Sequence, residues 1–204
     1  MSSPLRQIEP DRRPAPIEVK AAADLKYIRQ TMERASSFTA VPGWGGVAMG
    51  LVAIAATVIS GRAATPDAWI MTWVGTALVA TLIGAVTMVG KARADHVSIG
   101  SAPGRRFVLS LLPPMIAGAI ASMAIYGSGH VELLPGLWLL LYGAGVVTGG
   151  TYSVQIVPVM GLCFMALGTA TLFMPFETGQ VMLGVGFGGI HVVFGWIIAR
   201  RHGG

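Results

Sequence analysis

The sequence predicts an all-α protein, a polytopic transmembrane helical bundle of six spans preceded by an amphipathic helix on the cytosolic side. Hydrophobic residues make up 53% of the 204 residues and charged residues only 11%, whereas about a quarter of a soluble domain is charged. The apolar residues gather in six stretches after residue 41, and the basic residues are divided unevenly between the connections. These two patterns are typical of a multi-pass membrane protein.

The chain before the first span divides into a tail and a helix. Residues 1–16 are polar and rich in proline, so they offer too little apolar surface to fold, and we expect a disordered cytosolic tail. Residues 17–38 predict a cytosolic amphipathic helix. Its apolar side chains recur on one stripe, at Leu25, Ile28, Met32 and Ala35. Such a stripe either covers lipid headgroups or the protein's own cytosolic face, or docks a protein partner.

Residues 39–204 predict the transmembrane domain. A helix needs roughly 20 apolar residues to cross a hydrocarbon core of about 30 Å. The six candidate spans are residues 42–60, 69–90, 107–126, 134–150, 154–174 and 181–199. Pro42 suits the first turn of a helix because proline lacks a backbone donor, and Trp44 is typical of an interfacial anchor.

The distribution of Lys and Arg predicts the topology. Of the 14 basic residues, 13 lie before the first span, between the second and third spans, or after the last span, and only Arg62 lies elsewhere. Because cytoplasmic segments carry the excess of Lys and Arg, we expect both termini in the cytoplasm, which requires an even number of spans. The same distribution accounts for the net charge of +5, so no nucleic-acid partner is expected.

Groups that carry chemistry are scarce. The predicted spans contain no Asp, Glu, Lys or Arg, whereas ion-coupled transporters usually mark their pathway with such residues. The single cysteine, Cys163, and the scattered histidines offer no set of metal ligands. Enzyme patterns such as G-x-S-x-G and H-E-x-x-H are missing. We therefore expect no cofactor and no enzymatic activity.

Five residues are candidates for a ligand or packing site: His191, Pro113, Pro114, Tyr142 and Tyr152. His191 is the only imidazole within a span, and Gly184 and Gly188 share its side of the helix, which predicts that it is buried in the bundle. We expect it to be neutral and hydrogen-bonded to another helix. Hydroxyl partners are available at Thr72, Thr76 and Ser122.

The pair Pro113-Pro114 removes backbone donors from the third predicted span. This predicts a kink and carbonyl groups without an intrahelical partner. Such carbonyls either line a cavity or belong to a purely structural kink.

Small residues recur at four-residue spacing in several spans. The pairs are Gly46 and Gly50, Gly118 and Ser122, Gly145 and Gly149, and Gly184 and Gly188. This spacing lets helices approach closely. It favours packing inside the bundle over a homo-oligomer interface, which stays the alternative.

The stretch YIRQTMERASSFTAVPGWGG followed by apolar hairpins resembles a group of uncharacterised bacterial six-span inner-membrane proteins, mainly over residues 27–50. The resemblance implies the bacterial cytoplasmic (inner) membrane and attaches no activity. The size and span count also resemble the substrate-binding subunits of vitamin transporters. Their A-x-x-x-A pattern in the first span is replaced here by Gly46/Gly50 and Ala48/Val52.

These features favour a non-enzymatic accessory, assembly or sensory membrane subunit that acts through a partner at residues 17–38. The alternative is a small-molecule transport or ligand-binding protein of the substrate-binding subunit type. In that case an apolar cavity is expected near Pro113, Pro114, Tyr142 and His191.

Overall fold

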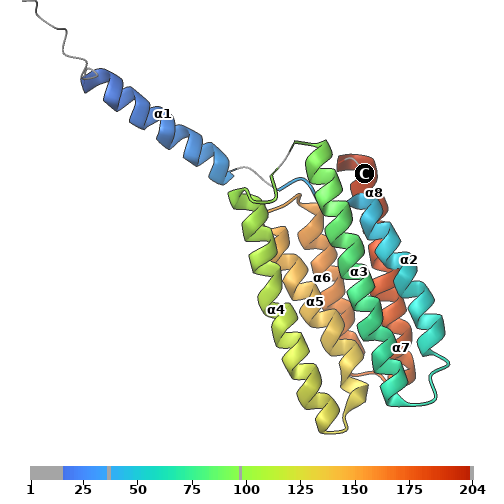
Figure 1. The fold of residues 1–204 in the computed structure, drawn as a ribbon. Helices are drawn as coiled ribbons and strands as arrows, with labels where there is room; N and C mark the ends of the chain where they lie inside the picture. The colour runs from blue at the N-terminus through green and yellow to red at the C-terminus, as the bar shows by residue number, and fades with distance from the viewer. Residues whose placement is uncertain (1–15, 36–37, 97, 203–204) are drawn as a thin grey trace, which may run out of the picture. The chain divides into compact units, whose positions relative to one another are not determined.

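The computed structural model describes residues 16–35, 38–96 and 98–202, and all its extended regular structure is helical (Figure 1). The chain forms two units, Met1–Ser36 and Ser37–Gly204, each described by itself. The first contains one helix, α1 (Pro16–Ala35), on which Leu25, Ile28 and Met32 are exposed. The predicted tail up to residue 15 lies outside the described residues.

The second unit is a bundle of helices that run along a common direction (Figure 1). The elements are α2 (Gly43–Ser60), α3 (Pro66–Ala94), α4 (Ala102–Gly127), the short 3-10 turn η1 (Val131–Leu133), α5 (Leu134–Gly150), α6 (Ile156–Thr171), α7 (Phe176–Leu183), the π-helix η2 (Gly184–Ile190) and α8 (His191–His202). The last three continue one another without a break.

Five helical segments of the described chain are long and apolar enough to cross a membrane. They are α2, α3, α4, η1 with α5, and α7 with η2 and α8. The fifth predicted span is present as α6, which is apolar but has only 16 residues. The chain is therefore a helical multi-pass membrane protein by length and composition.

Capping residues make two helices begin earlier than the apolar pattern predicts. The Thr65 hydroxyl accepts a hydrogen bond from the Ala68 N–H at 3.2 Å, and α3 begins at Pro66 instead of residue 69. The Ser101 hydroxyl accepts from the Gly104 N–H at 3.3 Å, and α4 begins at Ala102 instead of residue 107. Both caps satisfy backbone donors that a helix start leaves without a partner.

The helices of the bundle pack in two groups. In the α2 group, α2 lies against α3 and α8; in the α5 group, α5 lies against α4 and α6. The segments α7 and η2 join the two groups, since α7 contacts α5 and α6 and η2 contacts α2 and α6. The two most exposed of the long helices, α3 and α4, make no extended contact with each other over their described residues. The Tyr126 hydroxyl of α4 donates a hydrogen bond to Asp67 at the start of α3.

Glycines allow the close approach within each group. In the α5 group, a Cβ on Gly143 would lie 2.7 Å from the carbonyl oxygen of Gly161 on α6. In the α2 group, a Cβ on Gly195 would lie 2.8 Å from the carbonyl oxygen of Gly43. Any side chain at these positions would force the helices apart. At the predicted position Gly50 a Cβ would lie 2.7 Å from the carbonyl oxygen of Gly188, so the predicted use of small residues for packing inside the bundle is confirmed there.

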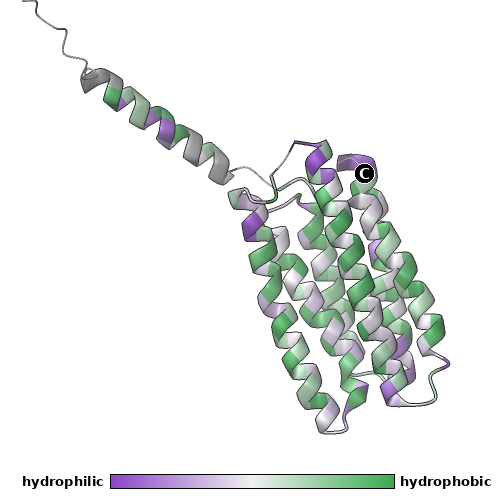
Figure 2. Cartoon of the chain, in the orientation of Figure 1, coloured by the Kyte–Doolittle hydropathy of each residue, from purple (hydrophilic) through white to green (hydrophobic). Residues whose placement is uncertain are grey.

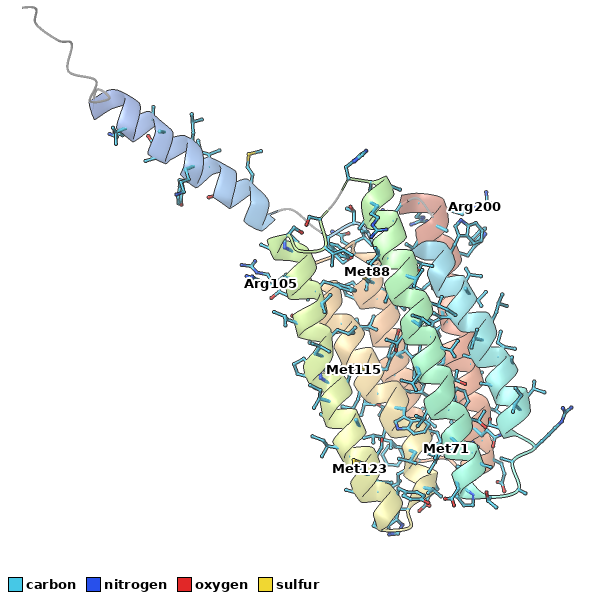
Figure 3. All side chains as sticks on the ribbon, in the orientation of Figure 1. Met71, Met88, Arg105, Met115, Met123 and Arg200 are labelled. Carbon is cyan, nitrogen blue, oxygen red and sulfur yellow. The ribbon has the colours of Figure 1, made fainter. Side chains whose placement is uncertain are left out.

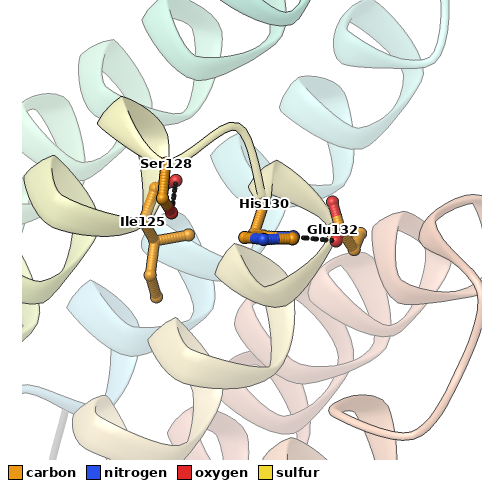
Figure 4. Close-up of polar contacts among 4 residues, drawn as sticks. All are labelled: Ile125, Ser128, His130 and Glu132. Atoms are coloured by element: carbon orange, nitrogen blue, oxygen red, sulfur yellow. Dashed lines mark hydrogen bonds and ion pairs between the residues drawn. The ribbon is translucent and has the colours of Figure 1, made fainter.

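Polar residues lie at the ends of the bundle (Figure 2). Arg105 and Arg200 lie at one end, and Met71 and Met123 lie toward the other (Figure 3). Figure 4 shows the connection that follows α4, where the Ser128 hydroxyl donates to the Ile125 carbonyl at 2.9 Å and His130 contacts Glu132 at 3.0 Å.

Candidate functional site

His191 and Tyr142 form a polar pair in the interior of the bundle. The Tyr142 hydroxyl and His191 Nε2 are 2.7 Å apart and hydrogen-bonded, which links α5 to the start of α8. The His191 side chain is buried, with 4% of its surface exposed. Its Nδ1 lies near the Phe187 carbonyl but makes no hydrogen bond of good geometry. The predicted burial of His191 is confirmed.

The prediction for the partner of His191 is wrong, because the hydroxyl comes from Tyr142 and not from Thr72, Thr76 or Ser122. Each of these three hydroxyls donates to a carbonyl four residues earlier in its own helix, at 2.8, 2.7 and 2.6 Å. A Ser or Thr hydroxyl on a helix often makes this local bond. The phenol of Tyr142 is too long to reach back in the same way, so it bridges to another helix.

Aromatic rings enclose the pair. Phe164 lies 4.9 Å from Tyr142 and 5.2 Å from His191 between ring centroids, and Phe187 lies 5.1 Å from Tyr142. Phe164 is completely buried. Several of these contacts are edge-to-face, an arrangement that aromatic pairs favour. The polar pair is therefore enclosed by aromatic rings from α6 and η2.

The π-helix η2 positions this shell. Its seven residues, GVGFGGI, lie directly before His191 and include Phe187. A π-helix widens the turn, and such segments recur at functional sites. Glycine makes the irregular backbone accessible here, and Gly188 packs against Ile54 of α2, where a Cβ would come within 2.6 Å. The π-helix therefore lies directly next to His191, which is the only buried imidazole among the described residues.

The two prolines are not part of this site. α4 is one unbroken helix across Pro113 and Pro114, and Pro113 is exposed. A proline at position 114 leaves the Ser110 carbonyl without its intrahelical donor. The Thr148 hydroxyl of α5 donates to that carbonyl at 2.9 Å. The Ser110 carbonyl, which was predicted to lack a partner, therefore joins α4 to α5.

Tyr152 also lies away from the pair, in the turn that follows α5. It is partly exposed, and the Arg106 guanidinium lies 5.9 Å from its ring centroid. This is cation–π distance, and it ties the start of α4 to the end of α5. Of the five predicted site residues, the structure brings together only Tyr142 and His191.

A second polar arrangement, which the sequence did not indicate, holds the segment before α2. The Phe38 N–H donates to the Tyr152 carbonyl and the Ser153 hydroxyl donates to the Phe38 carbonyl, both at 2.7 Å. The Phe38 ring is 1% exposed and lies 5.4 Å from the Phe107 ring. The predicted helix 17–38 thus ends before Phe38, which makes an isolated bridge with Ser153.

Lys91 joins three segments at the end of the bundle where Phe38 is held. Its Nζ donates to the Val41 carbonyl at 3.1 Å and to the His202 carbonyl at 2.8 Å. The side chain is buried, with 8% of its surface exposed. The segment before α2, the end of α3 and the end of α8 therefore meet at one cation.

Sequence reasoning also missed a tryptophan cluster near the start of α3. Trp69 and Trp73 are 3% and 4% exposed, and Trp69 stacks on Trp138 at 5.3 Å with an interplanar angle of 8°. The four-residue spacing of Trp69 and Trp73, which places both on one face of the helix, is the signal that was available.

Among the described residues, no three His, Cys, Asp or Glu side chains lie close enough to hold a metal ion. No family model matches the chain, and no match was found among curated proteins or solved structures.

Proposed function

We propose that the chain is a six-span protein of the bacterial inner membrane with both termini in the cytoplasm. The basic end that carries Arg105 and Arg200 is then the cytoplasmic end. α6 supplies the sixth crossing: its 16 residues rise about 24 Å, and it lies alongside α5. A short span is tolerated because the bilayer thins locally or flanking side chains adapt.

The function that the geometry supports best is that of a non-enzymatic sensory or accessory subunit that acts through a protein partner at α1. The observation that carries this proposal is the anchoring of Phe38 in the bundle. Only residues 36 and 37 separate this anchor from α1. A conformational change in the turn between α5 and α6 would therefore move Phe38, which lies close to the end of α1 in the sequence.

α1 has the surface for such a partner. Leu25, Ile28 and Met32 are 67%, 52% and 68% exposed and lie on one stripe. An amphipathic helix that buries such a stripe in a groove is a common form of protein recognition. The opposite face offers Ala23, which is also exposed.

The test compares two substitutions that add the same charge to opposite faces of α1, Ile28→Glu and Ala23→Glu. The full chain is extracted from its native membrane in lipid-retaining polymer particles, and the co-purifying proteins are quantified. We expect one protein at constant stoichiometry in the wild type and in Ala23→Glu, and its loss in Ile28→Glu. Equal recovery from both variants would refute docking through the stripe.

A second function, binding of a small molecule within the membrane, is favoured by a separate observation. Three buried ring nitrogens, Trp69 Nε1, Trp73 Nε1 and His191 Nδ1, make no hydrogen bond within the described residues. Buried polar atoms without partners are rare in folded proteins, so this part of the core has capacity for a further polar group.

A further inference from the structure

The two indole nitrogens of α3 are the strongest sign of a ligand in the molecule. Trp69 and Trp73 are almost fully buried, and neither Nε1 has a partner within the described residues. An indole nitrogen is a donor only. Trp138 of the same cluster shows the usual arrangement, because its Nε1 donates to the Ser122 hydroxyl at 2.7 Å. Two unpaired donors one turn apart on α3 therefore require an acceptor from elsewhere.

The rings that pack against the two tryptophans are aromatic. Trp69 stacks on Trp138 and meets the edge of Phe176 at 5.1 Å, and Trp73 lies 6.3 Å from Phe187. Both indoles belong to the hydrophobic core cluster that also contains Leu183 and Phe164. A charged ligand would incur a large desolvation cost there, whereas a flat uncharged ring can pack against such aromatic side chains.

The backbone gives an independent indication at the same place. Phe187, the neighbour of Trp73, belongs to the π-helix η2. π-Helices are rare and recur at functional sites. The unpaired donors lie on α3 and the irregular backbone lies in η2, and the two elements contact each other through the rings of Trp73 and Phe187.

Most of α3 is exposed on the outside of the bundle. α3 has no buried residue between Trp73 and Lys91. Over the described residues α3 makes no extended contact with α4. Apart from Lys91 and Ala92 near its other end, the two tryptophans are therefore the only buried residues of α3.

We propose that Trp69 and Trp73 are the donor pair of a binding site for a flat, uncharged, lipid-soluble ring with carbonyl acceptors, the class to which quinones belong. The indole N–H groups donate to the carbonyl oxygens, and the ring lies against the aromatic side chains of α5, α7 and η2. The site does not depend on docking at α1, so each of the two proposals stands or falls by its own experiment.

The test measures binding of a short-tailed ubiquinone analogue to the full chain in lipid nanodiscs, by the rise in melting temperature with probe concentration. A ligand that binds only the folded state raises this temperature as it saturates. We expect a rise of several degrees for the wild type and for the control Trp196→Phe, whose indole is half exposed. We expect at least tenfold weaker binding for Trp69→Phe and Trp73→Phe.

A second variant separates the lost donor from the lost ring volume. Benzothienylalanine at position 73 keeps the shape of tryptophan and replaces the N–H by sulfur. Because the N–H has no protein partner, the ligand-free protein should melt at the wild-type temperature or above it, while binding of the probe is lost. A lowered melting temperature, absence of any shift in the wild type, or an unchanged shift in the variants would each overturn the proposal.

Discussion

The Ser153 hydroxyl donates to the carbonyl of Phe38, a residue 115 positions earlier in the chain, at 2.7 Å. The bond is buried and joins the turn between α5 and α6 to the segment that leads into α2. The segment that leads into the first membrane-spanning helix is therefore packed as part of the bundle.

Ser153→Ala should destabilise the bundle, because it leaves the Phe38 carbonyl buried without this donor. The expected cost is about 1–3 kcal/mol, and Phe38→Ala should cost about 3–5 kcal/mol through the lost ring. The measurement is the melting temperature in detergent. Thr39→Ala, at an exposed neighbour, is the control and should melt like the wild type. A wild-type value for Ser153→Ala would contradict the described bond.

The hydrogen bond between Tyr142 and His191 should contribute little stability. Such bonds in membrane proteins average about 0.6 kcal/mol and reach about 1.7 kcal/mol. We expect a loss of this size for Tyr142→Phe and for His191→Leu, and a double variant less destabilised than the sum of the two. Tyr152→Phe, at a partly exposed tyrosine, is the matched control.

His191→Arg should be far more damaging than His191→Leu, because it buries a charge among aromatic rings. The recovery of monodisperse protein after detergent extraction measures this directly. Comparable recovery of the two variants would mean that the side chain at position 191 reaches water or lipid headgroups.

Packing at Gly143 should tolerate no side chain. A Cβ there would lie 2.7 Å from a backbone oxygen of α6, whereas a Cβ on Gly75 of α3 meets nothing within 4 Å. Gly143→Ala should therefore lower the melting temperature, since forced overpacking costs about 1–3 kcal/mol. Gly75→Ala should leave it unchanged or raise it, as alanine favours helix by about 0.5–1 kcal/mol. The reverse order would show that α5 and α6 are not in this register.

Reporter fusions test the topology. A reporter after Gly204 should be active on the cytoplasmic side, and one inserted in residues 128–132 should be active on the opposite side. The physical reason is the division of Lys and Arg, 13 against 1. Reporters that give the same side would mean an even number of crossings between them, and α6 would then be the first helix to reconsider.

The sequence predicted the helices well and their partners poorly. Apolar length alone placed α5 at its observed bounds, because the bilayer requirement acts on each span separately. The glycines near His191 indicated its burial, since close packing is a property of one helix face. That Tyr142 would meet His191 depends on how α5 and α8 are rotated, which no local pattern encodes. Phe38 was missed for the same reason: its partner, Ser153, lies in a distant turn.

The exposed stripe of α1, with Leu25, Ile28 and Met32, is the proposed contact with a protein partner. The direct measurement places a photo-crosslinking amino acid at Ile28, and at Ala23 on the opposite face, in the full chain within living cells. Position 28 should give one discrete protein adduct that disappears when Met32→Glu is added, and position 23 should give none. Adducts to lipid alone at position 28, or the same adducts at both positions, would contradict the proposal.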